Sequence, residues 1–247
     1  MPASVPAPHM KAVAIIPARL ASARMERKAL REIMGLPLVV RVYQAVRLSP
    51  LLEDVIVATD SDEIMQVCGK HGVKACITSS AHRSGTERVH EVAASISADV
   101  FVNVQGDEPT ARPEHIAALL ETMKDPAVHV GTLKTPAAPE DINNPAAVKV
   151  VTDLHGRALY FSRATIPFDR DGAAPGYFKH LGFYAYRKPA LDRYVSLPES
   201  GLERAERLEQ LRFLENGIAI QVAETPYDTI GVDTEEDLQR AEKMLER

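Results

Sequence analysis

Three cationic side chains follow the first apolar run of the chain. The run Val13–Pro17 is followed by Arg19, Arg24 and Lys28, which lie within ten residues of one another. Two arginine forks and a lysine point charge are suited to binding a polyphosphate. The segment lacks the glycines of a Walker P-loop or of a dinucleotide-binding loop, which argues against an ordinary ATPase and against a dehydrogenase. A solvated surface loop is the alternative interpretation.

Acidic residues occur in two other predicted turns of the chain. Asp107 and Glu108 lie in the turn QGDEP after the apolar segment Val100–Gln105, and Asp233 lies in GVDT before a helical pattern. Carboxylates at such positions can hold Mg²⁺ that is bridged to substrate phosphates. An acidic turn and an ordinary helix cap remain open as structural alternatives. Together with the three cations, however, the carboxylates predict a metal–triphosphate site.

Further polar residues are of the types that bind a base or an acidic sugar. The segment His82–Arg88 opens a predicted helix, and the helix N-terminus at Ser84 and Gly85 favours an anion or a base edge. An arginine accompanied by other hydrogen-bonding groups suits a carboxylated polyhydroxy substrate. The second half of the chain supplies such a set: Arg163, His180, Tyr184, Glu209 and Gln210. Taken singly, each is equally compatible with packing or with a surface ion pair.

The elements that position these residues alternate between strand and helix in the first half. Strands are predicted at 13–17, 54–60, 75–78, 100–105 and 130–134, and helices at 37–48, 61–71, 86–97 and 113–124. Repeated strand–helix units with continuous apolar strands indicate an α/β fold with a doubly wound, mostly parallel sheet. In such a sheet, ligands bind beyond the carboxyl ends of the strands. The polar turns described above fall at those ends.

The second half of the chain is richer in strands. Segments 147–153 and 157–163 predict an antiparallel hairpin, 180–187 and 218–224 predict strands, and 202–217 predicts one helix. A closing helix begins at Thr234, which forms a capping-box pattern with Asp237. We therefore expect a β-rich insertion at about 128–190 within one domain of residues 11–247. Residues 1–10 are rich in Pro and Ala and are expected to form a disordered extension.

Composition excludes several functional classes. The net charge of −5 over 247 residues disfavours a non-specific nucleic-acid binder. Two cysteines are too few for a disulfide framework or a structural zinc site, and they suit a reducing cytoplasm. No apolar run reaches the ~18 residues of a membrane span, and the first residues do not resemble a signal peptide. We therefore expect a cytoplasmic protein with no nucleic-acid or membrane partner.

The motifs together resemble the 3-deoxy-manno-octulosonate (Kdo) cytidylyltransferases. The similar segments include IIPARLASAR, HRSGTERVHEV, NVQGDEP, FSRATIP, KHLGFYAY and GVDTEEDL, spread over about residues 13–240. NVQGDEP, FSRATIP and the HLG…Y segment are together specific to this family. The resemblance implies transfer of CMP from CTP to the anomeric hydroxyl of Kdo, with release of pyrophosphate, for lipopolysaccharide synthesis. It also implies a homodimer in which the β-rich insertion forms the subunit contact.

The resemblance assigns roles to individual positions. Arg19, Arg24 and Lys28 match the residues that bind the CTP phosphates, and Ser84 and Gly85 match those that contact the cytosine. Asp107 and Asp233 match the aspartates that bind Mg²⁺. The positions matching the sugar pocket are Gln105, Arg163, His180, Tyr184, Glu209 and Gln210. Asp107, Asp233, Lys28 and Arg19 are therefore the expected catalytic residues.

The first loop departs from the family pattern. Glu26 and Arg27 replace a Pro-Gly pair before Lys28. Because Arg27 lacks the access of glycine to positive φ, we expect the loop to follow another path, with Arg27 facing solvent.

Two other functions remain open. One is a cytidylyltransferase for another acid sugar, such as 8-amino-Kdo or a sialic acid, and the other is a non-catalytic CTP-binding module.

Overall fold

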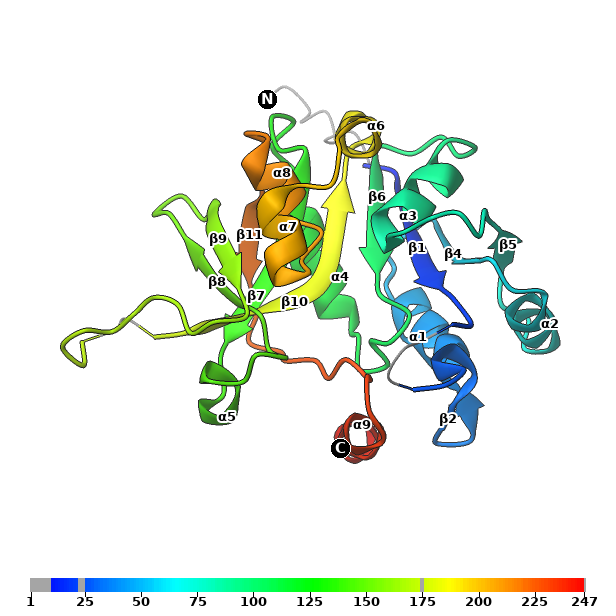
Figure 1. Cartoon of the computed structure of the whole chain (residues 1–247). Coiled ribbons are helices and arrows are strands. Elements are labelled where there is room, and N and C mark those ends of the chain that lie inside the picture. The colour runs from blue at the N-terminus through cyan, green and yellow to red at the C-terminus, as the bar shows by residue number, and fades with distance from the viewer. Residues whose placement is uncertain (1–9, 22–24, 174–175, 247) are drawn as a thin grey trace, which may run out of the picture.

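A nine-stranded sheet runs through the centre of the protein (Figure 1). The computed structural model describes residues 10–21, 25–173 and 176–246. The strand order is β11-β7-β10-β6-β1-β4-β5, and β8 and β9 continue the sheet beside β10. The strands of this sheet are β1 (Ala12–Ala18), β4 (Asp54–Thr59), β5 (Ala75–Ile77), β6 (Val100–Val104), β7 (Val130–Pro136), β8 (Lys149–Thr152), β9 (Ala158–Ser162), β10 (Phe178–Tyr186) and β11 (Gln221–Glu224). A separate ribbon pairs β2 (Glu32–Ile33) with β3 (Leu36–Pro37).

Along the order β11-β7-β10-β6-β1-β4-β5, four of the six neighbouring pairs of described strands are parallel. Strand β1 pairs in parallel with β4 and β6, β4 with β5, and β11 with β7. Strand β10 lies between β6 and β7 and runs antiparallel to both. Strands β1, β4 and β6 are covered on both faces, which explains their continuous apolar sequences. The predicted α/β fold with a mostly parallel sheet is confirmed.

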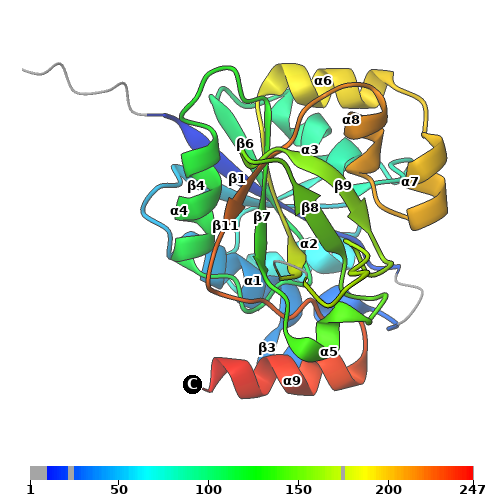
Figure 2. The ribbon, with the colours of Figure 1, turned by 90° about the vertical axis from the view of Figure 1, so that its left-hand side faces the viewer.

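Helices cover both faces of the sheet, and the sheet separates the apolar core into two layers (Figures 1 and 2). One layer contains side chains of α1 (Leu38–Arg47), α2 (Asp62–Lys70), α4 (Pro113–Thr122) and α9 (Glu235–Leu245). The other contains side chains of α3 (Gly85–Ala93), α6 (Lys188–Ser196) and α8 (Leu211–Glu215). Successive side chains of β1 point to opposite faces of the sheet, so Ile16 packs in the first layer and Ile15 in the second. The short helices are η1 (Lys28–Leu30), α5 (Pro139–Ile142) and α7 (Gly201–Glu206).

Two helices begin at the N-cap residues that the sequence predicts. The Ser61 side chain accepts a hydrogen bond from the Ile64 amide at the start of α2. Thr234 and Asp237 form a reciprocal capping box at the start of α9. These contacts satisfy amide groups that the first helical turn leaves without partners. Both predicted caps are confirmed.

The prediction of one helix over 202–217 is wrong. The chain forms α7 and α8, separated at Arg207, which adopts a left-handed conformation with φ 56°. The break places Leu208 and Leu211 in the core and turns Glu209 toward the start of α3. Tertiary contacts therefore interrupt a segment whose local sequence favours a continuous helix.

The strand-rich segment 128–190 forms part of the main sheet. It supplies β7 and β10, which lie between β11 and β6 in the sheet. It also supplies the hairpin β8–β9, in which β8 pairs with β10 at Lys179. Residues 1–9 of the predicted extension lie outside the described residues. In the described part of the chain, no helix is both long and apolar enough to cross a lipid bilayer.

Candidate active site

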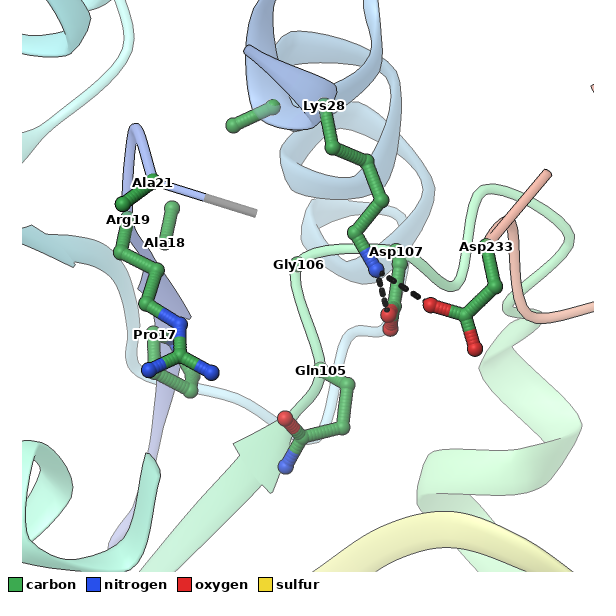
Figure 3. A pocket seen from close by; sticks show the side chains of 10 residues that line it. Pro17, Ala18, Arg19, Ala21, Lys28, Gln105, Gly106, Asp107 and Asp233 are labelled. Atoms are coloured by element: carbon green, nitrogen blue, oxygen red, sulfur yellow. Dashed lines mark hydrogen bonds and ion pairs between the residues drawn. The ribbon is translucent and has the colours of Figure 1, made fainter. Parts of the chain in front are cut away.

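A cavity opens at the carboxyl ends of β1 and β6 (Figure 3). Its walls come from the end of β1, from η1, from the turn after β6 and from the loop before α9. The turn passes very close to β1, because a Cβ added to Gly106 would lie 2.7 Å from the carbonyl oxygen of Pro17. Only glycine fits this approach without displacing the backbone. The tight turn brings Asp107 to the cavity.

Lys28 joins the two predicted metal-binding aspartates. Its Nζ atom lies 2.6 Å from Oδ2 of Asp107 and 2.9 Å from Oδ1 of Asp233. Burial alone would lower the pKa of Lys28, but the two nearby carboxylates outweigh burial and raise it. The ammonium therefore stays charged at neutral pH. One cation already sits between two carboxylates that are far apart in sequence.

Arg19 faces the same cavity from the side opposite Lys28, with Gln105 near the base of the view (Figure 3). Arg19 is exposed, so its guanidinium is accessible to a ligand. Gln105 donates from Nε2 to Oδ1 of Asn103 at 3.2 Å. Arg24, the third predicted phosphate-binding cation, lies outside the described residues. The structure thus brings together Arg19, Lys28 and both aspartates.

The loop before Lys28 does not avoid the left-handed conformation as expected. Arg27 has φ 55° and ψ 35°, in the region that glycine favours, and its carbonyl accepts the Leu30 amide at 2.8 Å. The expectation of another backbone path is therefore wrong at this residue. Arg27 holds this conformation at the N-cap position of η1, and its side chain, 53% exposed, forms an ion pair with Glu63 of α2. The prediction that Arg27 faces solvent is confirmed.

The N-terminus of α3 forms an adjoining cavity. Ser84 caps α3 by accepting the Glu87 amide at 3.1 Å. Glu209 accepts hydrogen bonds from the amides of Gly85 and Thr86, both at 3.3 Å, and from the Thr86 hydroxyl at 2.8 Å. Burial raises the pKa of Glu209, and these hydrogen bonds act in the opposite direction. Ser84, Gly85, Glu209 and Gln105 all line this second cavity, as does Arg19.

His180 and Tyr184 lie together on β10, with ring centroids 5.4 Å apart. The His180 ring also contacts Phe161, and its Nε2 lies 3.0 Å from Oγ1 of Thr132. Burial lowers the pKa of His180 to about 3, so the imidazole is neutral at physiological pH. Burial also raises the pKa of Tyr184 well above its usual value, which keeps the phenol protonated. Both side chains therefore act as neutral hydrogen-bonding groups.

Arg163 and Gln210 are held in the surrounding framework. The Arg163 guanidinium donates to the carbonyl oxygens of Glu206 at 2.8 Å and Pro145 at 3.0 Å. Gln210 is buried at the start of α8. Neither residue lines the cavity that holds Lys28. Of the predicted sugar-binding set, Gln105 and Glu209 line the cavity at the start of α3, whereas His180 lines a different cavity that also contains Asp107.

The comparisons with known proteins agree with this geometry. A family model described as Cytidylyltransferase matches residues 13–221. The 3-deoxy-manno-octulosonate cytidylyltransferase of Koribacter versatilis (strain Ellin345) is 66% identical over 246 residues, which cover 97% of this chain and 94% of that protein. The chain belongs to the 3-deoxy-manno-octulosonate cytidylyltransferase family. The resemblance inferred from the motifs is confirmed.

Other members of the Kdo cytidylyltransferase family match nearly as completely. The 3-deoxy-manno-octulosonate cytidylyltransferase of Acidobacterium capsulatum is 55% identical and covers 96% of this chain and 97% of its own. A solved structure of CMP:2-keto-3-deoxy-manno-octonic acid synthetase complexed with CTP has a TM-score of 0.90 at 41% identity. The match covers 96% of this chain and 98% of that one. Family and fold therefore agree over almost the whole length.

Two further charged residues lie near the site: Glu108, which the sequence pattern indicates, and Lys179, which it does not. Glu108 lines a neighbouring cavity together with Asp107, and burial, followed by the charge of Asp107, raises its pKa to about 7. Lys179 on β10 lines the same cavity and pairs with Asp228 at 2.9 Å and Asp141 at 3.3 Å. The acidic turn made Glu108 a candidate Mg²⁺ ligand beside Asp107, but Glu108 does not line the cavity that holds Lys28. Nothing local in the sequence marks Lys179, because its partners come from distant segments.

Proposed function

We propose that the chain transfers CMP from CTP to the anomeric hydroxyl of Kdo and releases pyrophosphate. The observation that carries the proposal is the convergence of Asp107, Asp233 and Lys28 on one cavity at the carboxyl edge of the sheet. This arrangement occurs in a chain that is 66% identical to a 3-deoxy-manno-octulosonate cytidylyltransferase. A pure CTP-binding module has no need of two converging carboxylates. The product would serve lipopolysaccharide synthesis.

The reaction requires positioning and charge neutralisation more than a covalent nucleophile. In-line attack on the α-phosphorus passes through a transition state whose charge is spread over phosphate oxygens. Arg19 and Lys28 face the cavity from opposite sides and would neutralise the triphosphate and the departing pyrophosphate, with Arg24 as a further cation. Ser84 and Gly85 at the start of α3 would bind the cytosine. Preorganised charges of this kind require little rearrangement during the reaction.

The aspartates are suited to holding Mg²⁺. Their oxygens are hard donors, and the shared Lys28 ammonium demonstrates that the space between them accepts a cation. Mg²⁺ is commonly held by one or two carboxylates together with substrate phosphates, which agrees with two aspartates beside a triphosphate site. When bound, the metal would lower the pKa of the attacking hydroxyl and neutralise charge on the phosphate. Asp107 and Asp233 are therefore the proposed ligands.

The sugar acid would bind beside this site, between Gln105 and the start of α8. Arg163 would bind the carboxylate of the sugar, because a guanidinium forms strong charge-assisted hydrogen bonds with carboxylates. His180 and Tyr184 would bind hydroxyl groups as neutral partners, and Glu209 and Gln210 would complete the pocket. Glu209 and Gln105 line the same cavity, which supports a sugar position next to the cytosine end of the nucleotide site.

We also propose that two copies of the chain pair through the β-rich segment in the cytoplasm. Three large apolar side chains are strongly exposed there: Leu154 (103%), Leu159 (62%) and Phe168 (87%). A second copy that covered these side chains would remove apolar surface from water, which supports the pairing. Cys68 and Cys76 are free thiols, which suits a reducing compartment. Light scattering of the wild-type chain and of Leu159→Asp tests the pairing, and a monomeric wild type would contradict it.

The activity is tested by measuring pyrophosphate release. We expect release to require CTP, Kdo and Mg²⁺ together, and to be abolished by excess chelator. Asp107→Asn and Asp233→Asn should lose activity and remain folded, whereas Asp171→Asn, at a side chain 83% exposed, serves as the matched control. Faster release with 8-amino-Kdo or a sialic acid would assign another sugar. Near-native activity of Asp107→Asn would contradict the proposed site.

A further inference from the structure

Two loops that carry the aspartates are bonded directly to each other. The carbonyl oxygen of Asp107 accepts the amide of Val232, the residue before Asp233, at 2.8 Å. A second bond lies close by, because the Thr110 hydroxyl oxygen accepts the amide of Ile230 at 3.0 Å. Thr110 is 3% exposed, so water does not compete for this bond. One bond would leave the loops free to rotate about it, whereas two bonds fix their relative orientation.

Glu108 adds a third link between the same loops. Its carboxyl group lies beside the side chain of Thr229, which favours the charged form. It is packed between two glycines, since a Cβ added to Gly182 or Gly231 would lie 3.4 or 3.5 Å from Oε1. The side chain is therefore enclosed by Thr229, Gly182 and Gly231. Thr110 and Glu108 thus both contact the segment 229–231, which leads directly into Asp233.

We infer that Thr110 is a positioning residue that sets the relative placement of Asp107 and Asp233, with Glu108 and Thr229 as its supporting contact. The inference rests on the proposed function, in which these aspartates hold the metal. Thr110 itself lines neither cavity that the aspartates line, so its effect on the site is transmitted through the backbone of residues 230–233. Removing its hydroxyl would leave the partly buried Ile230 amide without this acceptor and would release the loop.

The test compares Thr110→Val, which has nearly the same shape but no acceptor, with Thr110→Ser, which retains the acceptor. Mn²⁺ binding in the presence of a non-hydrolysable CTP analogue is measured by electron paramagnetic resonance. We expect Thr110→Val to weaken Mn²⁺ binding about tenfold and Thr110→Ser to stay within about twofold of wild type. In turnover, kcat should fall in Thr110→Val while the KM for Kdo stays unchanged.

A matched control separates positioning from a general loss of stability. Thr122→Val removes another buried hydroxyl, which donates to the Leu119 carbonyl on α4 at 2.6 Å, away from the site. It should lower the melting temperature without changing Mn²⁺ binding. If Thr110→Val does not fold, Thr229→Val interrupts the supporting contact and should weaken Mn²⁺ binding in the same direction.

Two results would overturn the inference: unchanged Mn²⁺ binding in folded Thr110→Val, or equal weakening in Thr122→Val. Failure of the proposed function is a separate outcome, in which wild type binds Mn²⁺ but releases no pyrophosphate from CTP and Kdo. The Mn²⁺ comparison between Thr110→Val and Thr110→Ser still decides the positioning role in that case.

Discussion

Replacing Lys28 with Met should affect metal and nucleotide in opposite directions. The Lys28 ammonium occupies the space between Asp107 and Asp233 in which we propose that Mg²⁺ binds. A metal that enters without nucleotide must displace this ammonium. Loss of the ammonium therefore favours metal binding to the free protein. It also removes a cation that would bind the CTP phosphates, so nucleotide affinity should fall.

The magnitude follows from the two contacts. Hydrogen bonds to charged groups contribute about 1.5–3 kcal/mol each. The Lys28 side chain is 18% exposed and the aspartates 26% and 34%, so solvent screens the pair and the lower end of this range applies. Since ~1.4 kcal/mol corresponds to a factor of ten, Lys28→Met should bind metal about tenfold more tightly in the absence of CTP. Its Kd for CTP should rise by about 10- to 100-fold.

Calorimetric titration measures both quantities on the same protein. Mn²⁺ is titrated into Lys28→Met without nucleotide, and CTP is then titrated in the presence of the metal. Lys124→Met is the matched control, because Lys124 pairs with Glu121 at the surface and its side chain is 68% exposed. If Lys28→Met binds metal no more tightly than wild type and binds CTP equally well, Lys28 is not the shared cation of the site.

Three other predictions concern single residues. Arg163→Ala should raise the KM for Kdo by about 10- to 100-fold with little change in the KM for CTP, and steady-state kinetics that show equal changes would place Arg163 elsewhere. Arg27→Val should lower the free energy of unfolding by about 1–2 kcal/mol relative to Arg27→Gly, because a β-branched residue is strained at φ 55°. Equal stability of the two in denaturant titration would refute that strain. His180, whose pKa is lowered to about 3 by burial, takes up a proton more readily in the unfolded state, where the pKa is about 6.5. Wild type should therefore lose up to about 2 kcal/mol of stability between pH 7 and pH 5 relative to His180→Gln, and a parallel decline in both proteins would contradict the assigned burial.

The sequence was most informative where local chemistry determines structure. The apolar run of β1 predicted a strand buried on both faces, and Ser61 and Thr234 predicted the starts of α2 and α9. The turn after β6 also predicted that Asp107 lies at the edge of the sheet, since Gly106 permits the close approach to Pro17. These features depend on residues near one another in the chain.

The remaining features depend on distant contacts. The direction of β10 between β6 and β7 is set by pairing across the sheet, which its own sequence does not encode. The break at Arg207 arises because Glu209 bonds to the start of α3. Arg27 adopts a left-handed conformation at the start of η1, which its residue type disfavours. Motif spacing therefore identified the candidates for the site but not the contacts that hold them.

A single-turnover experiment tests direct transfer of CMP to the sugar. Enzyme in excess over α-³²P-labelled CTP is mixed with Mg²⁺, with and without Kdo, and pyrophosphate and labelled products are followed on the timescale of one turnover. We predict no pyrophosphate and no labelled protein without Kdo, and stoichiometric pyrophosphate and CMP–Kdo with it, because the hydroxyl of the sugar is the nucleophile. A burst of pyrophosphate without Kdo, with label retained on the protein, would contradict direct displacement at Asp107 and Asp233.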